Sequence, residues 1–306
     1  MKKVDAIICS DLHLREDTPI CRTDDYWAAQ ERKVLYIKGL QQEYRCSVFD
    51  GGDLFNQWKA SPRLLAWAIK AMYNPITVAG QHDLPQHSLE MFHRSSLAVL
   101  EAAGVVKVNG VYELDNGIVV YSLPWGEKIP AIQSAHKEWK RKVLIHHITT
   151  YDGKTPWPGA EKTVENALGI LDRAEGFDLV VTGDNHKPFV VEDKGRVLVN
   201  SGSVMRMTAD QVDHRPRVYL WNAEENKVEP HYLPIEAGVV SREHMKEQKE
   251  CDERIEAFVS RLKGDVELGV SFEQNLERFF LEETAVTPEV KKIVWEAVQS
   301  IGKERI

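Results

Sequence analysis

Short runs of hydrophobic residues alternate with segments of helical periodicity over the first third of the chain. The runs are rich in β-branched residues and too short for helices, so each predicts a buried β-strand. These predicted strands are Val4–Cys9, Ser47–Phe49 and Ile76–Ala79. Between them, hydrophobic residues recur every three or four positions, which predicts the helices Arg32–Tyr44, Leu64–Met72 and Ser88–Ala103. This alternation is typical of an α/β sheet.

Predicted strands dominate from about residue 105 to residue 235. The dipeptide Asn116-Gly117 is a strong hairpin signal and separates Val111–Leu114 from Ile118–Ser122. Two further hairpins are predicted, Phe189–Glu192 with Arg196–Val199 and Arg217–Trp221 with Val228–Leu233. The remaining hydrophobic runs, Lys142–Ile145 and Leu179–Thr182, predict buried strands without a hairpin partner.

The composition shifts after Pro234 to charged segments of helical periodicity. Three helices are predicted there, over Ser241–Lys263, Phe272–Leu281 and Glu289–Ile301. We therefore expect one domain over residues 1–235 and a helical extension over residues 236–306, with Gly238 as the hinge. The hydrophobic faces of these helices could dock a partner or could equally pack on the chain's own core.

Charge and cysteine content narrow the class of protein. Lysine and arginine number 39 and acidic residues 47, so the formal net charge is −8, which argues against a general nucleic-acid coat. The four cysteines include no C-x-x-C pair, which argues against a structural zinc site and suits a reducing cytoplasm. No hydrophobic run approaches the ~20 residues that a membrane helix needs. We expect a cytoplasmic protein without a membrane segment.

Polar residues that can bind metal ions follow five predicted strands at their carboxyl ends. In chain order they are Asp11 and His13; Asp53; Gln81, His82 and Asp83; His146 and His147; Asp184 and His186. Open α/β sheets place their sites at this edge, and carboxylates, imidazoles and amides are ligands of divalent metals. A lone D-x-H or Gly-Asp pair is more often a solvated turn. The five groups together favour a metal site.

The order of these groups resembles the pattern of the calcineurin-like metallophosphoesterases, which is D-x-H, G-D, G-N-H-D, H and G-H-x-H. The matching residues here are Asp11, His13, Gly52, Asp53, Gly80, His82, Asp83, His146, Gly183 and His186. The resemblance covers roughly residues 1–235. It implies an α/β fold in which two mixed β-sheets form a sandwich flanked by helices, here with a C-terminal helical extension.

Within this family the chain looks most similar to the SbcD-type DNA exonucleases, especially their phage versions. The similar segments are Ser10–Leu14, Gly51–Phe55, Ser122–Gly126 and Asn200–Arg206. The resemblance implies a DNA exo/endonuclease subunit for repair or recombination, which works with an SbcC-type coiled-coil ABC ATPase and forms a homodimer. It also makes His147, Trp125 and Arg206 candidates for contacts with the DNA substrate.

The resemblance further implies two divalent metal ions about 3.5–4 Å apart, which hold a phosphodiester and acidify the attacking water. The residues that would bind the first ion are Asp11, His13 and His186. Those that would bind the second ion are Gln81, His146 and Asp184. Asp53 would bridge the two ions, because its two oxygens can reach two cations. Only one of His146 and His147 should be a direct ligand, and the family register favours His146.

His82 and Asp83 are the catalytic candidates that the resemblance implies. His82 would lie near the scissile phosphate and protonate the leaving oxygen or stabilise its charge. Asp83 would orient the His82 ring, as a carboxylate behind a catalytic imidazole does. The alternative for Asp83 is a helix N-cap before Leu84 and Pro85, and both roles could hold together.

The chain departs from the family pattern at two positions, where asparagine and histidine are replaced by Gln81 and Asp184. Glutamine is longer than asparagine and aspartate is shorter than histidine, so the two changes could compensate. The extra oxygen ligand favours manganese, with magnesium as the alternative, over zinc. Two other interpretations remain open: a non-catalytic scaffold with a degenerate second metal site, and a small-molecule phosphodiesterase or phosphatase on the same fold.

Overall fold

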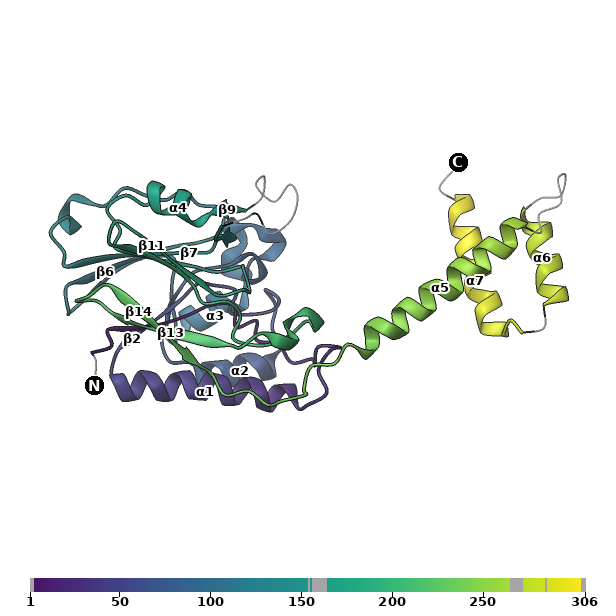
Figure 1. Ribbon diagram of the computed structural model, residues 1–306, viewed down its shortest axis with the longest axis horizontal. Helices are drawn as coiled ribbons and strands as arrows, with labels where there is room; N and C mark the ends of the chain where they lie inside the picture. Colours follow the sequence, from purple (N-terminus) through teal and green to yellow (C-terminus); the bar gives the residue numbers. More distant parts are fainter. Residues whose placement is uncertain (1–2, 154, 156–163, 265–271, 284, 304–306) are drawn as a thin grey trace. The chain divides into compact units, whose positions relative to one another are not determined.

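The computed structural model describes residues 3–153, 155, 164–264, 272–283 and 285–303. The chain divides into two compact units, residues 1–241 and residues 242–306. The first unit is an α/β sandwich of two mixed β-sheets flanked by helices, and the second is helical (Figure 1). The predicted fold class is therefore confirmed.

Each sheet of the sandwich has six strands. The first sheet has the order β14-β13-β1-β2-β3-β4, with β14 Lys227–Tyr232, β13 Arg217–Asn222, β1 Ala6–Cys9, β2 Ser47–Asp50, β3 Ile76–Thr77 and β4 Lys107–Val108. The second has the order β11-β12-β10-β7-β6-β5, with β11 Phe189–Asp193, β12 Arg196–Asn200, β10 Leu179–Thr182, β7 Arg141–His146, β6 Ile118–Leu123 and β5 Val111–Leu114. A short pair, β8 Thr150–Tyr151 and β9 Glu165–Asn166, stands apart. The three predicted hairpins pair as expected.

The central strands, such as β1, β7 and β10, are buried on both faces because each sheet lies between the other sheet and a layer of helices. On β1, Ala6 and Ile8 pack in the cluster between the sheets, whereas Ile7 and Cys9 pack in the cluster on the helical side. Helices α1 (Tyr26–Tyr44), α2 (Pro62–Ala71) and α3 (Ser96–Ala102) cover the first sheet, and α4 (Ala167–Arg173) covers the second. Burial on both faces explains why the sequences of these strands are continuously hydrophobic and do not alternate with polar residues.

Two of the predicted helices differ from the structure by more than two residues at an end or by an interruption, whereas the others differ by one or two residues at their ends. Helix α1 begins at Tyr26, six residues before the predicted start, because the carboxylate of Asp25 accepts a hydrogen bond from the Ala28 backbone N–H. The predicted helix 88–103 is interrupted at Ser95, whose extended backbone separates a 3-10 helix over Leu89–Arg94 from α3. The sequence patterns also did not predict β4, β8, β9 and α4, which are short elements.

The register of the parallel strands brings the predicted ligand segments to one edge of the sandwich. Cys9 of β1 lies opposite Asp50 of β2, and His146 of β7 lies opposite Thr182 of β10. The backbone N–H of Asp11 then donates to Gly52 O, so the two loops that follow β1 and β2 run side by side. Residues that are far apart in the sequence therefore converge where these strands end.

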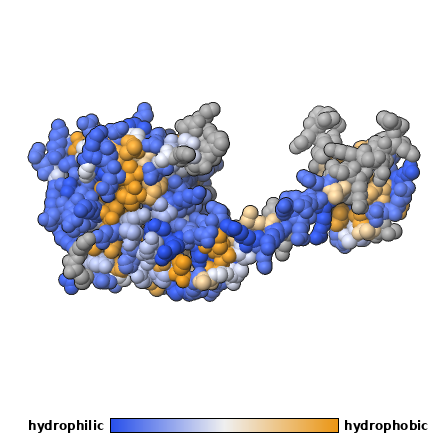
Figure 2. All heavy atoms as spheres, viewed as in Figure 1, coloured by the Kyte–Doolittle hydropathy of each residue, from blue (hydrophilic) through white to orange (hydrophobic). Residues whose placement is uncertain are grey.

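The second unit consists of α5 (Glu243–Gly264), α6 (Phe272–Glu282) and α7 (Pro288–Lys303). Leu276 and Phe280 of α6 are buried, and the Phe280 ring lies 6.4 Å from the ring of Trp295 on α7. Figure 2 shows hydrophobic residues gathered around α6 and α7, whereas the coloured residues of α5 are mainly hydrophilic. Among the described residues, no helix is long and apolar enough to cross a membrane.

Candidate metal centre

Asp11, His13 and His186 form what we call the first ligand group. The Nε2 atoms of His13 and His186 lie 3.1 Å apart, and each lies 3.9 Å from Asp11 Oδ1. Asp11 and His13 are fully buried, whereas His186 is partly exposed. Two imidazole nitrogens and a carboxylate oxygen that face one another in this way have the donor set and spacing to share one cation.

Several candidate ligand residues have left-handed backbone conformations, which set the direction of their side chains. Asp11, His13, Asp53 and Asp184 have φ angles between 44° and 70°. This region is costly for residues other than glycine, by about 1–3 kcal/mol each, and persists only where the surroundings impose it. Here the backbone bonds from Asp11 N to Gly52 O and from His13 N to Asp53 O hold the loops. Strain concentrated on these residues is typical of a functional site.

Asp53 lies between the first ligand group and the loop after β7. Its Oδ1 accepts a hydrogen bond of 2.9 Å from the His82 backbone N–H. Its Oδ2 lies 3.8 Å from His13 Nε2 and 3.4 Å from His147 Nε2. The carboxylate therefore occupies the position expected of a bridging ligand, but only Oδ2 faces the imidazoles on both sides.

The histidine pair after β7 differs from the expectation. His147, and not His146, lies beside Asp53, and its Nδ1 donates to Gly51 O at 2.6 Å. The ring of His146 turns the other way, with Nδ1 at 3.2 Å from Leu123 O. Consecutive residues of an extended segment point to opposite sides, so only one of the pair can reach the centre. The geometry assigns that place to His147, whereas the family register had favoured His146 as the direct ligand of the pair.

Gln81 and Asp184 are in direct contact, and together with His147 they form what we call the second ligand group. The Gln81 side-chain amide donates to Asp184 Oδ1, and the Thr149 hydroxyl donates to Asp184 Oδ2. The backbone N–H of Asp184 donates to Asp11 Oδ1 at 3.0 Å, which joins this group to the first one. Thr149 was not predicted, because a threonine two residues after a histidine pair carries no signal of its own.

His82 lies at the exposed mouth of the centre. Its ring packs edge to face on His13, with the centroids 4.9 Å apart, and its Nδ1 donates to the carbonyl oxygen of Asn56 at 3.0 Å. A ring nitrogen of His82 lies within 4.8 Å of ligand atoms of His13 and Asp53. This bond to Asn56 fixes the tautomer of the neutral ring and leaves Nε2 for the substrate side.

Asp83 does not orient the His82 ring, contrary to the expectation. Its buried carboxylate accepts backbone N–H groups from Phe55 at 2.9 Å, and from Leu54 and Gly80 at 3.2 Å each. Burial and the nearby Asp53 raise the pKa of Asp83 to about 8. Asp83 therefore joins the loop after β2 to the loop after β3, which is close to the capping alternative. Asn56 orients the His82 ring in its place.

Two glycines permit the close approach of these loops. A Cβ atom on Gly80 would lie 2.1 Å from Asp53 Oδ1 and 2.7 Å from Asp53 N. A Cβ atom on Gly183 would lie 2.4 Å from Gly51 O and 2.8 Å from His147 Nδ1. Neither position has room for any side chain, so both glycines are required by packing around the candidate ligands.

The two remaining substrate candidates have different environments. Trp125 follows β6 and is 39% exposed, and its ring centroid lies 6.1 Å from that of His87. Arg206 is buried, and its guanidinium donates to Val212 O at 3.3 Å and to Glu236 O at 2.7 Å. Because those carbonyl groups occupy the guanidinium, Arg206 is a structural residue that holds the end of the first unit together, not a substrate contact.

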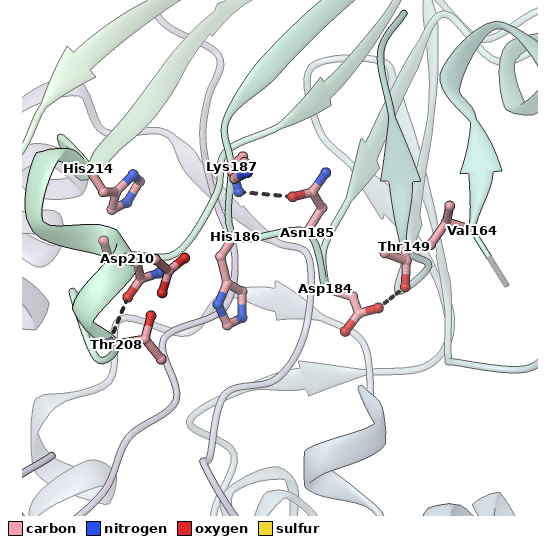
Figure 3. Close-up of a pocket in the computed structure, with 10 residues that line it drawn as sticks. Thr149, Val164, Asp184, Asn185, His186, Lys187, Thr208, Asp210 and His214 are labelled. Atoms are coloured by element: carbon pink, nitrogen blue, oxygen red, sulfur yellow. Dashed lines mark hydrogen bonds between the residues drawn. The ribbon is translucent and has the colours of Figure 1, made fainter. Parts of the chain in front are cut away.

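A cavity of about 640 Å³ opens beside the two ligand groups. Its lining residues are Thr149, Val164, Asp184, Asn185, His186, Lys187, Thr208, Asp210, Gln211 and His214. Figure 3 shows Asp184 and Thr149 on one side and the turn that carries Thr208, Asp210 and His214 on the other, with His186 between them. The turn, a 3-10 helix over Ala209–Asp213, was not predicted. Its residues come from a loop distant in sequence and lack a recognisable motif.

Buried polar atoms without protein partners test whether metal ions fit this centre. In the described part of the chain, five such atoms belong to the ligand groups and to Asp53: Asp11 Oδ2, His13 Nδ1, Asp53 Oδ2, Gln81 Oε1 and His147 Nε2. Each is an atom type that binds divalent cations. Leaving a buried polar atom unpaired costs about 1–3 kcal/mol, so a cluster of them at one point fits the binding of cations there.

The charges around His147 also favour a cation at this centre. Burial lowers the pKa of His13 to about 3 and that of His146 to about 4. Burial also opposes a charge on His147, but the carboxylates of Asp53, Asp11 and Asp184 outweigh it and raise the pKa of His147 to about 10. A buried imidazole that attracts a proton this strongly marks a point where positive charge is favoured, as a metal cation would be.

Comparison with known proteins agrees with this geometry. The family model described as calcineurin-like phosphoesterase matches residues 6–188. No curated protein matches the chain.

The solved structures that are similar to the chain are distant from it in sequence. An archaeal phosphodiesterase is 12% identical, with 74% of this chain and 99% of that chain covered and a TM-score of 0.39. The phosphopantetheinyl hydrolase of Mycobacterium tuberculosis is 12% identical (71% and 94% covered, TM-score 0.39). A metallophosphoesterase from Sphaerobacter thermophilus is 11% identical (76% and 89% covered, TM-score 0.37). Because the family model spans more than half of the 306 residues, the chain belongs to the calcineurin-like phosphoesterase family.

Proposed function

We propose that this chain is a metal-dependent DNA nuclease that hydrolyses phosphodiester bonds and is similar to the SbcD-type exonucleases. The observation that carries the hydrolytic part is the set of five buried, unpartnered ligand atoms beside the exposed His82. The DNA substrate is supported by the segments Ser10–Leu14, Gly51–Phe55 and Ser122–Gly126, which resemble those nucleases.

Two divalent ions would supply positive charge for the phosphate and acidify the attacking water. The first ligand group would hold one ion, the second would hold the other, and Asp53 Oδ2 would be shared. The second group offers an amide oxygen, a carboxylate and one imidazole. This oxygen-rich set favours manganese, with magnesium as the alternative, over zinc.

His82 would act on the leaving oxygen of the phosphodiester. Its Nδ1–H is engaged with Asn56 O, so a proton on Nε2 of the imidazolium form is the one available for transfer. A positioned general acid of this kind contributes roughly 10²–10⁴-fold to the rate. Asp83 would contribute indirectly, because it holds the loop on which His82 lies against the loop after β2.

The partners of the chain also belong to this proposal. We propose that the second unit docks an SbcC-type coiled-coil ABC ATPase, because it is a separate compact unit in which Leu281 and Ile293 stay 83% and 64% exposed. We further propose that the chain acts in the cytoplasm as a homodimer, as the resemblance to SbcD-type nucleases implies.

A second candidate is hydrolysis of a small phosphodiester. The cavity beside His186 favours it, because about 640 Å³ lies within the range of small-molecule sites. A chain end of DNA could enter the same space. The two candidates therefore differ in the substrate that binds, not in the residues at the centre.

The test is degradation of end-labelled single- and double-stranded DNA with Mn²⁺, Mg²⁺ or chelator, beside hydrolysis of bis(p-nitrophenyl) phosphate. We expect manganese-dependent DNA cutting that His82→Ala reduces by roughly 10²-fold or more. His93→Ala is the matched control, because His93 is also exposed but bonds only to Glu90 O outside the centre.

Each alternative has its own result. Hydrolysis of bis(p-nitrophenyl) phosphate without DNA cutting, even with the ATPase supplied, would favour the small-molecule enzyme. Failure to hydrolyse either substrate, together with failure to bind metal ions in equilibrium dialysis, would favour a non-catalytic scaffold.

A further inference from the structure

Two exposed aromatic rings lie close to the loop that carries Gln81, a member of the second ligand group. Trp125 is 39% exposed and His87 is also exposed, and their ring centroids are 6.1 Å apart with the planes inclined by 55°. The ligands and the proposed acid account for neither ring. The pair therefore requires a separate explanation.

Both residues are hydrogen-bonded to the segment that carries Gln81 and His82, Trp125 through its backbone and His87 through its ring. The backbone N–H of Trp125 donates to Ala79 O at 3.0 Å, two residues before Gln81. The ring Nδ1 of His87 donates to Gln81 O at 3.0 Å. These two bonds place the rings next to a ligand of the second group, so whatever contacts the rings also lies close to the metal centre.

The backbone that presents His87 is strained. Gln86 and His87 have φ angles of 53° and 56°, so two consecutive residues other than glycine adopt the left-handed conformation. Such conformations cost about 1–3 kcal/mol each and mark sites where the conformation itself has a use. The reversal of the chain here turns the His87 ring back toward Gln81 O and toward Trp125.

The chemistry of Trp125 also differs from that of a packing tryptophan. The buried Trp221 donates its indole N–H to Asn226 Oδ1 at 3.0 Å. Within the described residues, the indole of Trp125 has no hydrogen-bond partner. An exposed indole face with a free N–H, paired with an imidazole face, can stack on a flat aromatic ligand and offer it a donor.

We propose that Trp125 and His87 form a stacking site for an unpaired nucleobase, adjacent to the nucleotide whose phosphate lies at the metal centre. This inference rests on the proposed nuclease function and specifies its substrate. Bases inside a duplex have both faces covered by their neighbours, so only a base in a single strand or at a frayed end can stack on these rings. The chain therefore requires single-stranded nucleotides at the point of cutting.

The test distinguishes contacts with bases from contacts with phosphates by comparing two DNA ligands on the same protein. A labelled thymidine oligomer and an abasic oligomer of the same length carry the same phosphates but differ in bases. Their affinities are measured by fluorescence anisotropy with Ca²⁺ as the divalent ion, and the length of each oligomer is checked after titration. We expect the unmodified protein to bind the thymidine oligomer more tightly than the abasic one.

Variants then locate the preference. Trp125→Ala should weaken binding of the thymidine oligomer roughly 5- to 100-fold and change binding of the abasic oligomer less than about 2-fold. Trp125→Phe should lose less, because it keeps an aromatic face. His87→Asn keeps a side-chain N–H and tolerates positive φ. A lower affinity of this variant for the thymidine oligomer would therefore report the contribution of the imidazole ring alone. Tyr232→Ala is the control, since Tyr232 is 43% exposed and lies on β14.

The outcomes distinguish this inference from the function on which it rests. Equal affinity of the unmodified protein for both oligomers would overturn the stacking site, as would equal losses on both oligomers in Trp125→Ala. The nuclease proposal would stand in either case if the protein still cuts DNA. A protein that neither binds the oligomers nor cuts DNA would contradict the nuclease proposal and this inference together.

Discussion

The side-chain amide of Gln81 donates a hydrogen bond to the carboxylate of Asp184, across 103 positions of sequence. These are the two positions at which the chain departs from the expected ligand pattern. Their contact means that a change at one position alters the surroundings of the other directly. Whether the two changes in side-chain length compensate each other is therefore open to direct test.

The first prediction concerns this pair. Gln81→Asn would shorten one side chain and Asp184→His would lengthen the other, so each alone should misplace the second ligand group. We expect each single variant to lower kcat/KM for bis(p-nitrophenyl) phosphate with Mn²⁺ by roughly 10- to 100-fold. The double variant should recover much of that loss, because the two changes compensate. Losses that simply add in the double variant would count against a matched pair.

The second prediction distinguishes the adjacent histidines. His147→Asn should weaken binding of metal ions at least roughly 10-fold, because His147 Nε2 lies 3.4 Å from Asp53 Oδ2. His146→Asn is the matched variant and should keep its metal ions, because the His146 ring is engaged with Leu123 O. Equilibrium dialysis with Mn²⁺ measures both. The opposite order of losses would restore the sequence-based assignment of His146.

The third prediction uses the space around Gly80. In Gly80→Ala the new methyl group would collide with Asp53, so the shared carboxylate must move. We expect metal affinity to fall roughly 10-fold or more, with a measurable loss of stability in urea. Gly169→Ala in α4 is the control, because nothing lies within 4 Å of its Cβ position. That change should raise the stability by up to about 1 kcal/mol and leave metal binding unaltered.

The fourth prediction concerns pH and the buried Lys33. Burial, with help from Arg206 and Arg22, lowers the pKa of Lys33 from 10.5 to about 7, while its amine donates to Val204 O. Between pH 7 and 10.5 the unfolded chain binds a proton that the folded chain lacks, so this group makes the protein more stable as pH rises. The loss of folding stability caused by burying the charged Lys33 amine is fully present below about pH 7 and disappears toward pH 10.5.

Lys33→Met removes this titration. Relative to the unmodified protein, the variant should be most favoured near pH 7 and should lose that advantage toward pH 10, where only the lost bond to Val204 O remains. Urea denaturation at a series of pH values measures the difference. Lys70→Met, at an exposed lysine on α2, is the control and should show no such trend. A difference for Lys33→Met that does not vary with pH would contradict the prediction.

Local patterns were sufficient for most of the strands. The strand Leu179–Thr182 has the predicted limits, and the hairpin turns at Asn116-Gly117 as predicted. Both features depend on residues that are adjacent in the sequence, through burial on both faces and through the conformations that turn residues allow. The interruption of the predicted helix at Ser95 was missed. A capping serine within a helical pattern is recognised only when the packing on either side is known.

The sequence by itself determined the fold class and placed Asp11, His13, Asp53 and His186 after the carboxyl ends of strands β1, β2 and β10, because sites of α/β sheets lie at these ends. Only the tertiary structure decided which of His146 and His147 faces Asp53, that Asn56 and not Asp83 holds the His82 ring, and that carbonyl groups occupy Arg206. Those outcomes depend on the direction of single side chains and on contacts between loops far apart in the chain. Residue spacing carries no information about either.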